Sequence, residues 1–81
     1  MKLKNFYLDI KSNNKDLIVL VKYGNFYKCF EDDSYIINYL LNYKINNKNS
    51  LGFKVNAVDK VLSILKDNNI SCIVINDIKI N

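Results

Sequence analysis

The chain has 81 residues, 49% of them hydrophobic and 25% charged, which allows one modest globular core and is too apolar for a disordered segment. Its twelve basic residues are all lysine and exceed its eight acids by four, a balance that suits a polyanionic partner but, without arginine, excludes bidentate reading of guanine. With no histidine and only Cys29 and Cys72, the chain lacks a zinc ligand set and a Cys-His nucleophile pair, and no disulfide framework is expected.

The first predicted element is a short amphipathic helix. The polar run 12–14 closes a stretch whose apolar residues fall at positions i, i+3, i+4 and i+7: Leu3, Phe6, Tyr7 and Ile10. Asp9 interrupts the basic opening, so no signal peptide is expected. The longest unbroken apolar run, 17–21, is too short to cross a bilayer. We therefore expect a soluble, cytoplasmic protein with no membrane contact.

A β-hairpin is expected next. The run "LIVLVKY" at 17–23 is rich in β-branched residues and almost continuously apolar, which is typical of a strand buried on both faces. Gly24 and Asn25 suit a tight turn, and residues 26–30 can return as a second strand.

The middle of the chain is predicted to hold a second helix, a loop and a third strand. Asp32, Asp33 and Ser34 are typical N-cap residues, and the helix they begin has an apolar stripe made of Ile36, Ile37, Leu40 and Leu41. The polar cluster 46–50 reads as a loop, and "LGFKV" at 51–55 reads as a strand.

A third helix follows this strand. Asn56 and Asp59 resemble a weak capping box at its start, and the asparagines at 68–69 end it. Its apolar residues hold helical spacing throughout: Val58, Val61, Leu62 and Leu65.

Two further strands are expected at the end of the chain. "ISCIVI" at 70–75 forms the first, residues 76–77 turn the chain, and residues 78–80 pair back. The complete order predicts a single domain over residues 1–81, of the α/β class, with a mixed β-sheet and about three flanking helices.

The second strand carries the most distinctive surface. Side-chain alternation places Phe26, Lys28 and Phe30 on one of its faces, and Tyr27 and Cys29 on the other. An aromatic ring that projects from a turn beside an amine can stack in an opened duplex step while the amine binds a phosphate or a base edge. In the alternative interpretation the phenylalanines cover the sheet and Lys28 extends to solvent. Spacing by itself is more typical of packing.

These residues lie within a longer pattern. The run "GNFYKCFEDDSYIINYLLNYKI" resembles the segment of the MutS mismatch-repair proteins in which a Gly-Asp-Phe-Tyr-Glu motif is followed by an aromatic residue, an acid and a helix. The preceding "FYLDIKSNNKDLIVLVKYG" and the later "LGFKVNAVDKVLSILKDNNISCIVIN" resemble the rest of that family's N-terminal domain in the same order. The resemblance implies a MutS domain I fold that stands alone.

The same resemblance implies roles for individual residues. In the family the motif phenylalanine enters the minor groove and stacks on a mispaired base, and the glutamate two residues later hydrogen-bonds that base. The wedge is carried over to Phe26, and the turn to Gly24 and Asn25. Tyr27 matches the neighbouring aromatic residue, and Lys28 occupies the glutamate position. An ammonium group only donates hydrogen bonds, so Lys28 can bind base acceptors or phosphate but cannot act as an acceptor.

Other side chains are weaker candidates for contacts with a ligand. Lys44 and Lys48, around the Asn-rich loop, are expected phosphate contacts. Tyr35, Tyr39 and Tyr43 recur every four residues. We expect them to edge the core with solvated hydroxyl groups, and the alternative is a second stacking stripe.

We expect no enzyme activity, no cofactor and no metal site. No Walker-type Gly-Lys-Ser/Thr loop occurs, and nothing resembles the ATPase regions of MutS. The acids at 31–33 are expected to begin a helix rather than bind Mg²⁺. The tripeptide "DIK" at 9–11 and 77–79 is too common by chance to identify a nuclease.

The sequence therefore favours a DNA-binding domain, in which Phe26 stacks on a distorted or mispaired base and lysines contact phosphate. DNA is the expected partner, and a further protein chain is a candidate to supply other functions. The alternative is a protein-interaction module of a mobile element or phage that keeps the fold without DNA recognition. Lysines clustered around Phe26 would favour DNA binding, whereas an exposed apolar patch elsewhere would favour the alternative.

Overall fold

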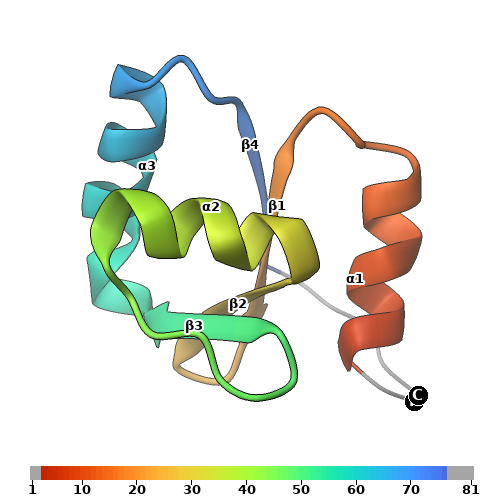
Figure 1. Cartoon of the computed structure of the whole chain (residues 1–81). Coiled ribbons are helices and arrows are strands. Elements are labelled where there is room, and N and C mark those ends of the chain that lie inside the picture. Colours follow the sequence, from red (N-terminus) through yellow and green to blue (C-terminus); the bar gives the residue numbers. More distant parts are fainter. Residues whose placement is uncertain (1–2, 77–81) are drawn as a thin grey trace.

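The structure is a computed structural model that describes residues 3–76. Its helices and strands follow one another in the order expected from the sequence (Figure 1). They are α1 (Leu3–Ser12), β1 (Ile18–Tyr23), β2 (Phe26–Phe30), α2 (Glu31–Leu41), β3 (Ser50–Lys54), the short 3-10 helix η1 (Val55–Ala57), α3 (Val58–Asp67) and β4 (Cys72–Ile75).

The four strands form one mixed sheet in the order β3-β2-β1-β4. β2 runs antiparallel to both of its neighbours, whereas β1 and β4 are parallel. A parallel pair needs a crossover connection, and the chain between β1 and β4 contains β2, α2, β3, η1 and α3. The expected α/β class and the mixed sheet with three flanking helices are confirmed. The strand expected at 78–80, with the turn before it, lies outside the described residues.

The sheet is the middle layer of the fold. In Figure 1 helix α1 lies on one side of it, and α2 and α3 lie on the other. β1 is an inner strand with helices on both sides, and Val19, Leu20 and Val21 are completely buried. This confirms the expectation of a strand buried on both faces, and it explains why the run is apolar without alternation.

The expected helix caps are wrong. α2 begins at Glu31 directly after β2, its N-cap residue is Phe30, and no side chain caps it. Glu31 adopts a positive φ of 53°, and its N–H donates to the carbonyl of Asn49, so a sharp backbone bend replaces a capping side chain. Ser34 is buried and donates its hydroxyl to the carbonyl of Cys29 instead of capping the helix.

The capping box expected at the third helix is also wrong. α3 starts at Val58 after η1, with Ala57 as its N-cap residue and no side-chain cap. Asn56 lies inside η1, where the chain already curls into helical geometry before α3. Asn56 therefore precedes the N-cap residue of α3 and does not cap that helix.

Asp33, in α2, is buried where side chains of α1 and the backbone of β1 donate to its carboxylate. The Tyr7 hydroxyl donates to Oδ2 at 2.5 Å, and the Val19 N–H donates to the same oxygen at 3.1 Å. Lys11 Nζ lies 2.9 Å from Oδ1 and also donates to the carbonyl of Leu17. Burial and the bond to Asp33 raise the pKa of Tyr7 above its ordinary value, so Tyr7 remains a donor. This one carboxylate joins α1, β1 and α2.

We expect Asp33→Asn to lower the free energy of unfolding by about 2–4 kcal/mol, because it leaves Lys11 without its anion and exchanges an acceptor for a donor in a buried network. Urea unfolding followed by circular dichroism measures the change. Asp32→Asn is the matched control, since Asp32 is the exposed neighbour in the same helix turn. Equal stability of the two variants would show that the network contributes nothing.

Candidate functional site

Part of the sheet face next to α1 is left uncovered at the β1–β2 hairpin. The strand register aligns Tyr23 with Phe26, and Phe26 with Lys54, in a row across three strands. The next row pairs Lys28 with Gly52. Directly opposite residues of antiparallel strands share a face. These five residues, Tyr23, Phe26, Lys28, Gly52 and Lys54, form what we call the open sheet face.

The coverage of this face changes along β2. Phe30 is buried, with its ring 5.1 Å from the ring of Tyr7 in α1. Phe26, at the opposite end of the same strand, is 41% exposed, and Tyr23 is 54% exposed. The two phenylalanines of β2 therefore differ in exposure. α1 covers Phe30, whereas Phe26 remains open to a ligand.

A tight turn presents the two exposed rings. Gly24 has a φ of 64°, while Asn25 does not have a positive φ, a pattern typical of a type II′ hairpin turn. A Cβ built on Gly24 meets no atom within 4 Å, so the backbone conformation, and not space, favours glycine there. The Val55 N–H donates to the carbonyl of Asn25 at 3.0 Å, which fixes the tip of the hairpin against η1.

Tyr27 lies on the other side of the sheet. It is buried, its ring is 5.9 Å from that of Phe53, and its hydroxyl donates to Asn76 Oδ1 at 2.5 Å. The motif tyrosine therefore fixes β2 to β3 and to the residue after β4. Any contribution to binding comes from positioning Phe26 and Lys28, its neighbours along the strand.

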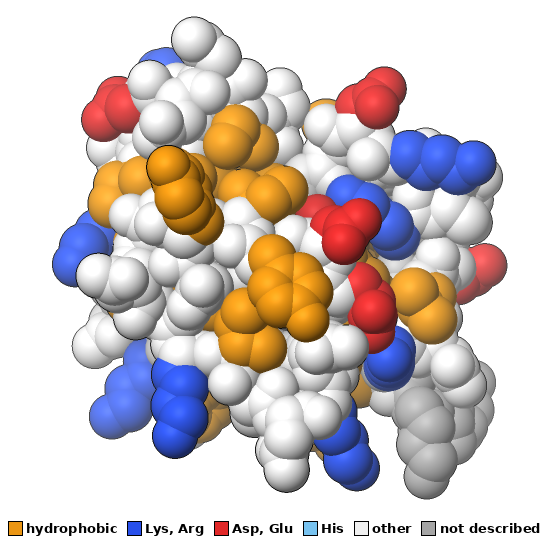
Figure 2. All heavy atoms as spheres, viewed as in Figure 1, with side chains coloured by type: hydrophobic (Ala, Val, Ile, Leu, Met, Phe, Trp, Pro, Cys, Tyr) orange, Lys and Arg blue, Asp and Glu red, His pale blue; other side chains and the backbone are white. Residues whose placement is uncertain are grey.

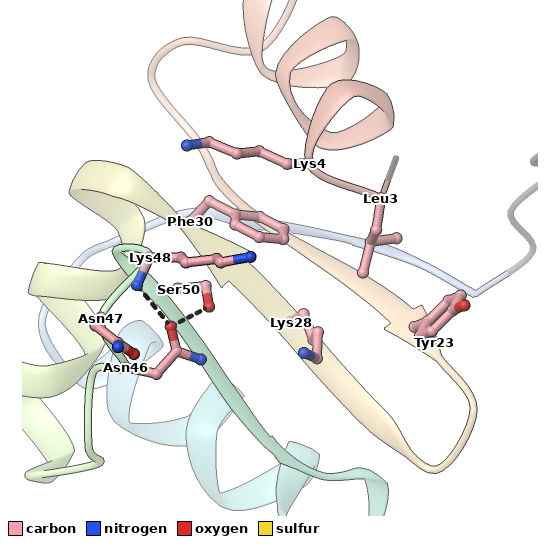
Figure 3. A pocket seen from close by; sticks show the side chains of 9 residues that line it. All are labelled: Leu3, Lys4, Tyr23, Lys28, Phe30, Asn46, Asn47, Lys48 and Ser50. Atoms are coloured by element: carbon pink, nitrogen blue, oxygen red, sulfur yellow. Dashed lines mark hydrogen bonds between the residues drawn. The ribbon is translucent and has the colours of Figure 1, made fainter. Parts of the chain in front are cut away.

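Lys28 lies between two hollows in the surface. The larger hollow, about 650 Å³, extends from the hairpin to α1 and the loop before β3 (Figure 3). Its lining residues are Leu3, Lys4, Tyr23, Lys28, Phe30, Asn46, Asn47, Lys48 and Ser50. The second hollow, about 430 Å³, is lined by Phe26, Lys28, Lys44, Asn46 and Gly52. Lys28 and Asn46 belong to both hollows, so the two form one continuous surface.

Gly52 has no side chain, and this leaves space for Lys28 to lie across it. A Cβ built on Gly52 would lie 3.6 Å from Cγ and 3.7 Å from Cε of Lys28. The aliphatic part of Lys28 therefore lies across the glycine, and its charged end extends over the sheet instead of directly away from it.

The loop before β3 carries two more of the lysines expected from the sequence. Asn46 Oδ1 accepts hydrogen bonds from the Lys48 N–H at 3.2 Å and from the Ser50 hydroxyl at 2.7 Å, as Figure 3 shows. Lys44 lines the smaller hollow and Lys48 the larger one. The asparagine thus folds the loop so that both lysines border the open sheet face.

The charge of this surface is positive. Within residues 3–76 the ion pairs are Lys4 with Glu31, at 2.7 Å, and Lys11 with Asp33. Lys28, Lys44 and Lys48 form no ion pair in that part of the chain, so their charge is available to an anion. Phe26 lines the smaller hollow together with Lys28 and Lys44, whereas Lys48 lines the larger hollow together with Lys28 and Phe30.

Sequence reasoning missed Tyr23 and Lys54. The signal was present, because a two-residue turn at Gly24 and Asn25 requires residues 23 and 26 to face each other. Lys54 depended on the pairing of β2 with β3, whose register no local pattern gives.

A second exposed apolar surface lies on the opposite side of the sheet. Tyr39 is 84% exposed and Tyr35 is 48% exposed, and Figure 2 shows hydrophobic side chains over α2. The three tyrosines at four-residue spacing therefore differ. The ring of Tyr43 lies 5.8 Å from the ring of Phe53, whereas Tyr35 and Tyr39 face solvent. A shallow hollow of about 370 Å³ there is lined by Tyr35, Ile36, Tyr39, Leu40, Asn68 and Ile70.

The acidic residues do not converge. Glu31 pairs with Lys4, and Asp33 is held in its buried network. Among residues 3–76 no group of three or more His, Cys, Asp or Glu side chains could hold a metal ion. The "DIK" tripeptide at 77–79 lies outside the described residues. None of the helices between residues 3 and 76 has the length and hydropathy of a membrane-spanning segment.

Neither cysteine is suited to nucleophilic chemistry. Burial raises the pKa of the Cys29 thiol from 9.0 to about 12, although the nearby Ser34 hydroxyl acts in the opposite direction. Burial also raises the pKa of Cys72 to about 11. Both thiols therefore stay protonated at neutral pH.

Comparison with known proteins gives two matches. Residues 1–76 match the family described as MutS domain I. The chain is also 36% identical over 64 residues to the DNA mismatch repair protein MutS of Fervidobacterium nodosum, an alignment that covers 75% of this chain. The same alignment covers only 8% of that relative, so the chain spans a small part of the protein it resembles.

We expect the thiols of the folded chain to react with iodoacetamide at least on the order of a hundredfold more slowly than those of the urea-unfolded chain at about pH 8, because raised pKa values reduce the thiolate fraction. Mass spectrometry of quenched samples measures both rates. The raised pKa values also predict a loss of stability as pH rises from 9.0, where unfolded thiols ionise, to about 12, where Cys29 ionises in the folded chain. Equal alkylation rates in the two states would contradict this assignment.

Proposed function

The chain belongs to the MutS domain I family, and we propose that its open sheet face binds DNA, with Phe26 stacking on a mispaired or otherwise distorted base. The observation that carries the proposal is the exposure of Phe26 at a hairpin tip bordered by lysines. A buried Phe26 would have supported the packing interpretation. Base stacking on an aromatic ring suits such a position, since every base presents a π-face.

The hairpin gives Phe26 the rigidity that a wedge needs. Gly24 fixes the turn, Asn25 is hydrogen-bonded to Val55, and Tyr27 packs on Phe53 below the strand. Inserting a side chain between base pairs costs a few kcal/mol of stacking energy per step, and the cost is smallest where pairing is already disturbed. A rigid ring is therefore selective for weakened sites without reading their sequence.

Lys28 shifts the recognition toward general electrostatic binding. Its ammonium can donate to the minor-groove acceptors of adenine and thymine, or to phosphate, but it cannot accept a hydrogen bond. Lys44 and Lys48 add charge at the edges of the same surface. We therefore propose binding that is weak, salt-dependent and tolerant of the kind of mispair.

This chain is similar to one part of a relative that is named a DNA mismatch repair protein. For this chain we propose a cytoplasmic role in mismatch repair through binding alone, without catalysis, cofactor or ATPase. A partner protein is the proposed source of any further activity, because the open sheet face offers contacts with a ligand but no group that performs chemistry.

A protein-interaction module is the second candidate function. The exposed tyrosines of α2, Tyr35 and Tyr39, favour it, because large apolar side chains that lie together on a surface often mark a protein contact. In this candidate function, a module of a mobile element or phage keeps the fold and uses the α2 surface instead of the open sheet face.

Phe26→Ala should weaken binding to a duplex with a single mismatch by roughly 1–3 kcal/mol, because it removes the stacking ring. Fluorescence anisotropy with mismatched and matched duplexes measures the loss, and circular dichroism verifies folding. Tyr39→Ala is the control, since it removes an exposed ring on the other side of the sheet. If both variants bind as the unmodified chain does, Phe26 is not a wedge. If no DNA binds even at low salt, the protein-interaction module becomes the better candidate.

Three phosphate contacts, from Lys28, Lys44 and Lys48, should make the logarithm of affinity fall with the logarithm of salt concentration at a slope of about −3. Replacing each lysine by glutamine should reduce the slope by about one unit per residue. Lys66→Gln, in the last turn of α3, is the control and should leave the slope unchanged. If the slope is unchanged in all three variants, the phosphate contacts lie elsewhere on the chain.

A further inference from the structure

The proposed function uses one ring of the open sheet face and leaves the other unexplained. Tyr23 is more exposed than Phe26, and the strand register places it directly opposite Phe26. We propose that Tyr23 and Phe26 together form a stacking surface for two consecutive unpaired bases, so that this face binds single-stranded DNA. The inference rests on the proposed function for the binding of DNA to this face and for the role of Phe26.

The geometry of the hairpin makes the two rings a pair. Directly opposite residues in an antiparallel ladder have Cβ atoms about 4.5–5.5 Å apart on one face. Tyr23 and Phe26 therefore stand side by side at the end of a sheet, without a third side chain between them. Exposed sheet surfaces with neighbouring aromatic residues are a recurrent means of stacking two or three bases of a single strand.

Lysines border this pair of rings on more than one side. Lys54 extends the row of Tyr23 and Phe26 onto β3, and Lys28 occupies the next row. The hollow beside Tyr23 leads past Lys28 to Lys48 (Figure 3). A strand whose bases rest on the rings would therefore have amines along its phosphates, which is the charge complementarity that single-strand binding requires.

A single strand fits this surface better than an intact duplex. One ring can enter one disturbed base step, but two neighbouring rings need two bases free of pairing, and each opened step costs a few kcal/mol in a duplex. Single strands do not have this cost. Lysine contacts and ring stacking also carry little sequence information, so binding should tolerate any base.

The surface is already formed in the free chain. The tip of the hairpin is fixed by the bond from Val55 to Asn25, and Tyr27 holds β2 from beneath through Phe53 and Asn76. Because Tyr23 and Phe26 flank the fixed turn, binding does not require the backbone to rearrange. This preorganisation lowers the entropic cost of capturing a flexible strand.

The test is fluorescence anisotropy of the full chain with a labelled twelve-nucleotide oligothymidylate and with a matched duplex of the same length. Tyr23→Leu keeps apolar bulk but removes the ring, and Tyr23→Phe keeps the ring. Tyr39→Leu removes an exposed tyrosine ring on the opposite side of the sheet and serves as the matched control. Circular dichroism verifies that each variant folds.

We expect the single strand to bind more tightly than the matched duplex, and Tyr23→Leu to weaken single-strand binding roughly 5- to 150-fold, the equivalent of losing one stacked base. Tyr23→Phe and Tyr39→Leu should bind as the unmodified chain does. If Tyr23→Leu has no effect while Phe26→Leu weakens binding to mismatched duplexes, this inference is wrong and the proposed function stands. If the folded chain binds no DNA of either kind, the proposed function fails, and this inference fails with it.

Discussion

The arrangement of the layers depends on the buried carboxylate of Asp33. It accepts hydrogen bonds from Tyr7 in α1 and from the backbone of Val19 in β1, and it pairs with Lys11 at the end of α1. A buried carboxylate is tolerated only when such partners satisfy it. The network therefore fixes α1 over the Phe30 end of β2. It leaves the hairpin end of the same sheet face uncovered, and this is where the candidate site lies.

The exposed surface follows from the same constraint. α1 covers Phe30 through Tyr7, whereas Phe26, four residues earlier on the same face, is out of its reach. Gly52 adds no side chain to fill the space, so the stem of Lys28 lies across the sheet. The result is a shallow, positive surface with aromatic rings at one end. Such a surface suits a flat, charged polymer better than a small molecule, which would require deeper enclosure.

The family supplies the scaffold, and this chain alters the surface that the scaffold presents. The resemblance to the MutS motif implies that Lys28 occupies a glutamate position, which would exchange an acceptor for a donor at the centre of the face. The hairpin itself keeps the features that hold a projecting ring: a turn with a positive φ at Gly24, and a buried Tyr27 beneath the strand. The position of the Phe26 ring and the charge beside it are thus independent, because the turn at Gly24 positions the ring whatever the charge of residue 28.

The sequence by itself determined the elements and several faces. The unbroken apolar run indicated the buried strand β1, the alternation along β2 separated Phe26 from Tyr27, and the Gly24-Asn25 pair indicated the hairpin, because these signals are local. Only the tertiary structure decided the role of Asp33, whose partner Tyr7 is 26 residues away and which sequence reasoning had assigned to a helix cap. It also decided which phenylalanine stays exposed and that Lys54 shares a row with Phe26. Burial and strand register depend on contacts between distant segments, which no local pattern records.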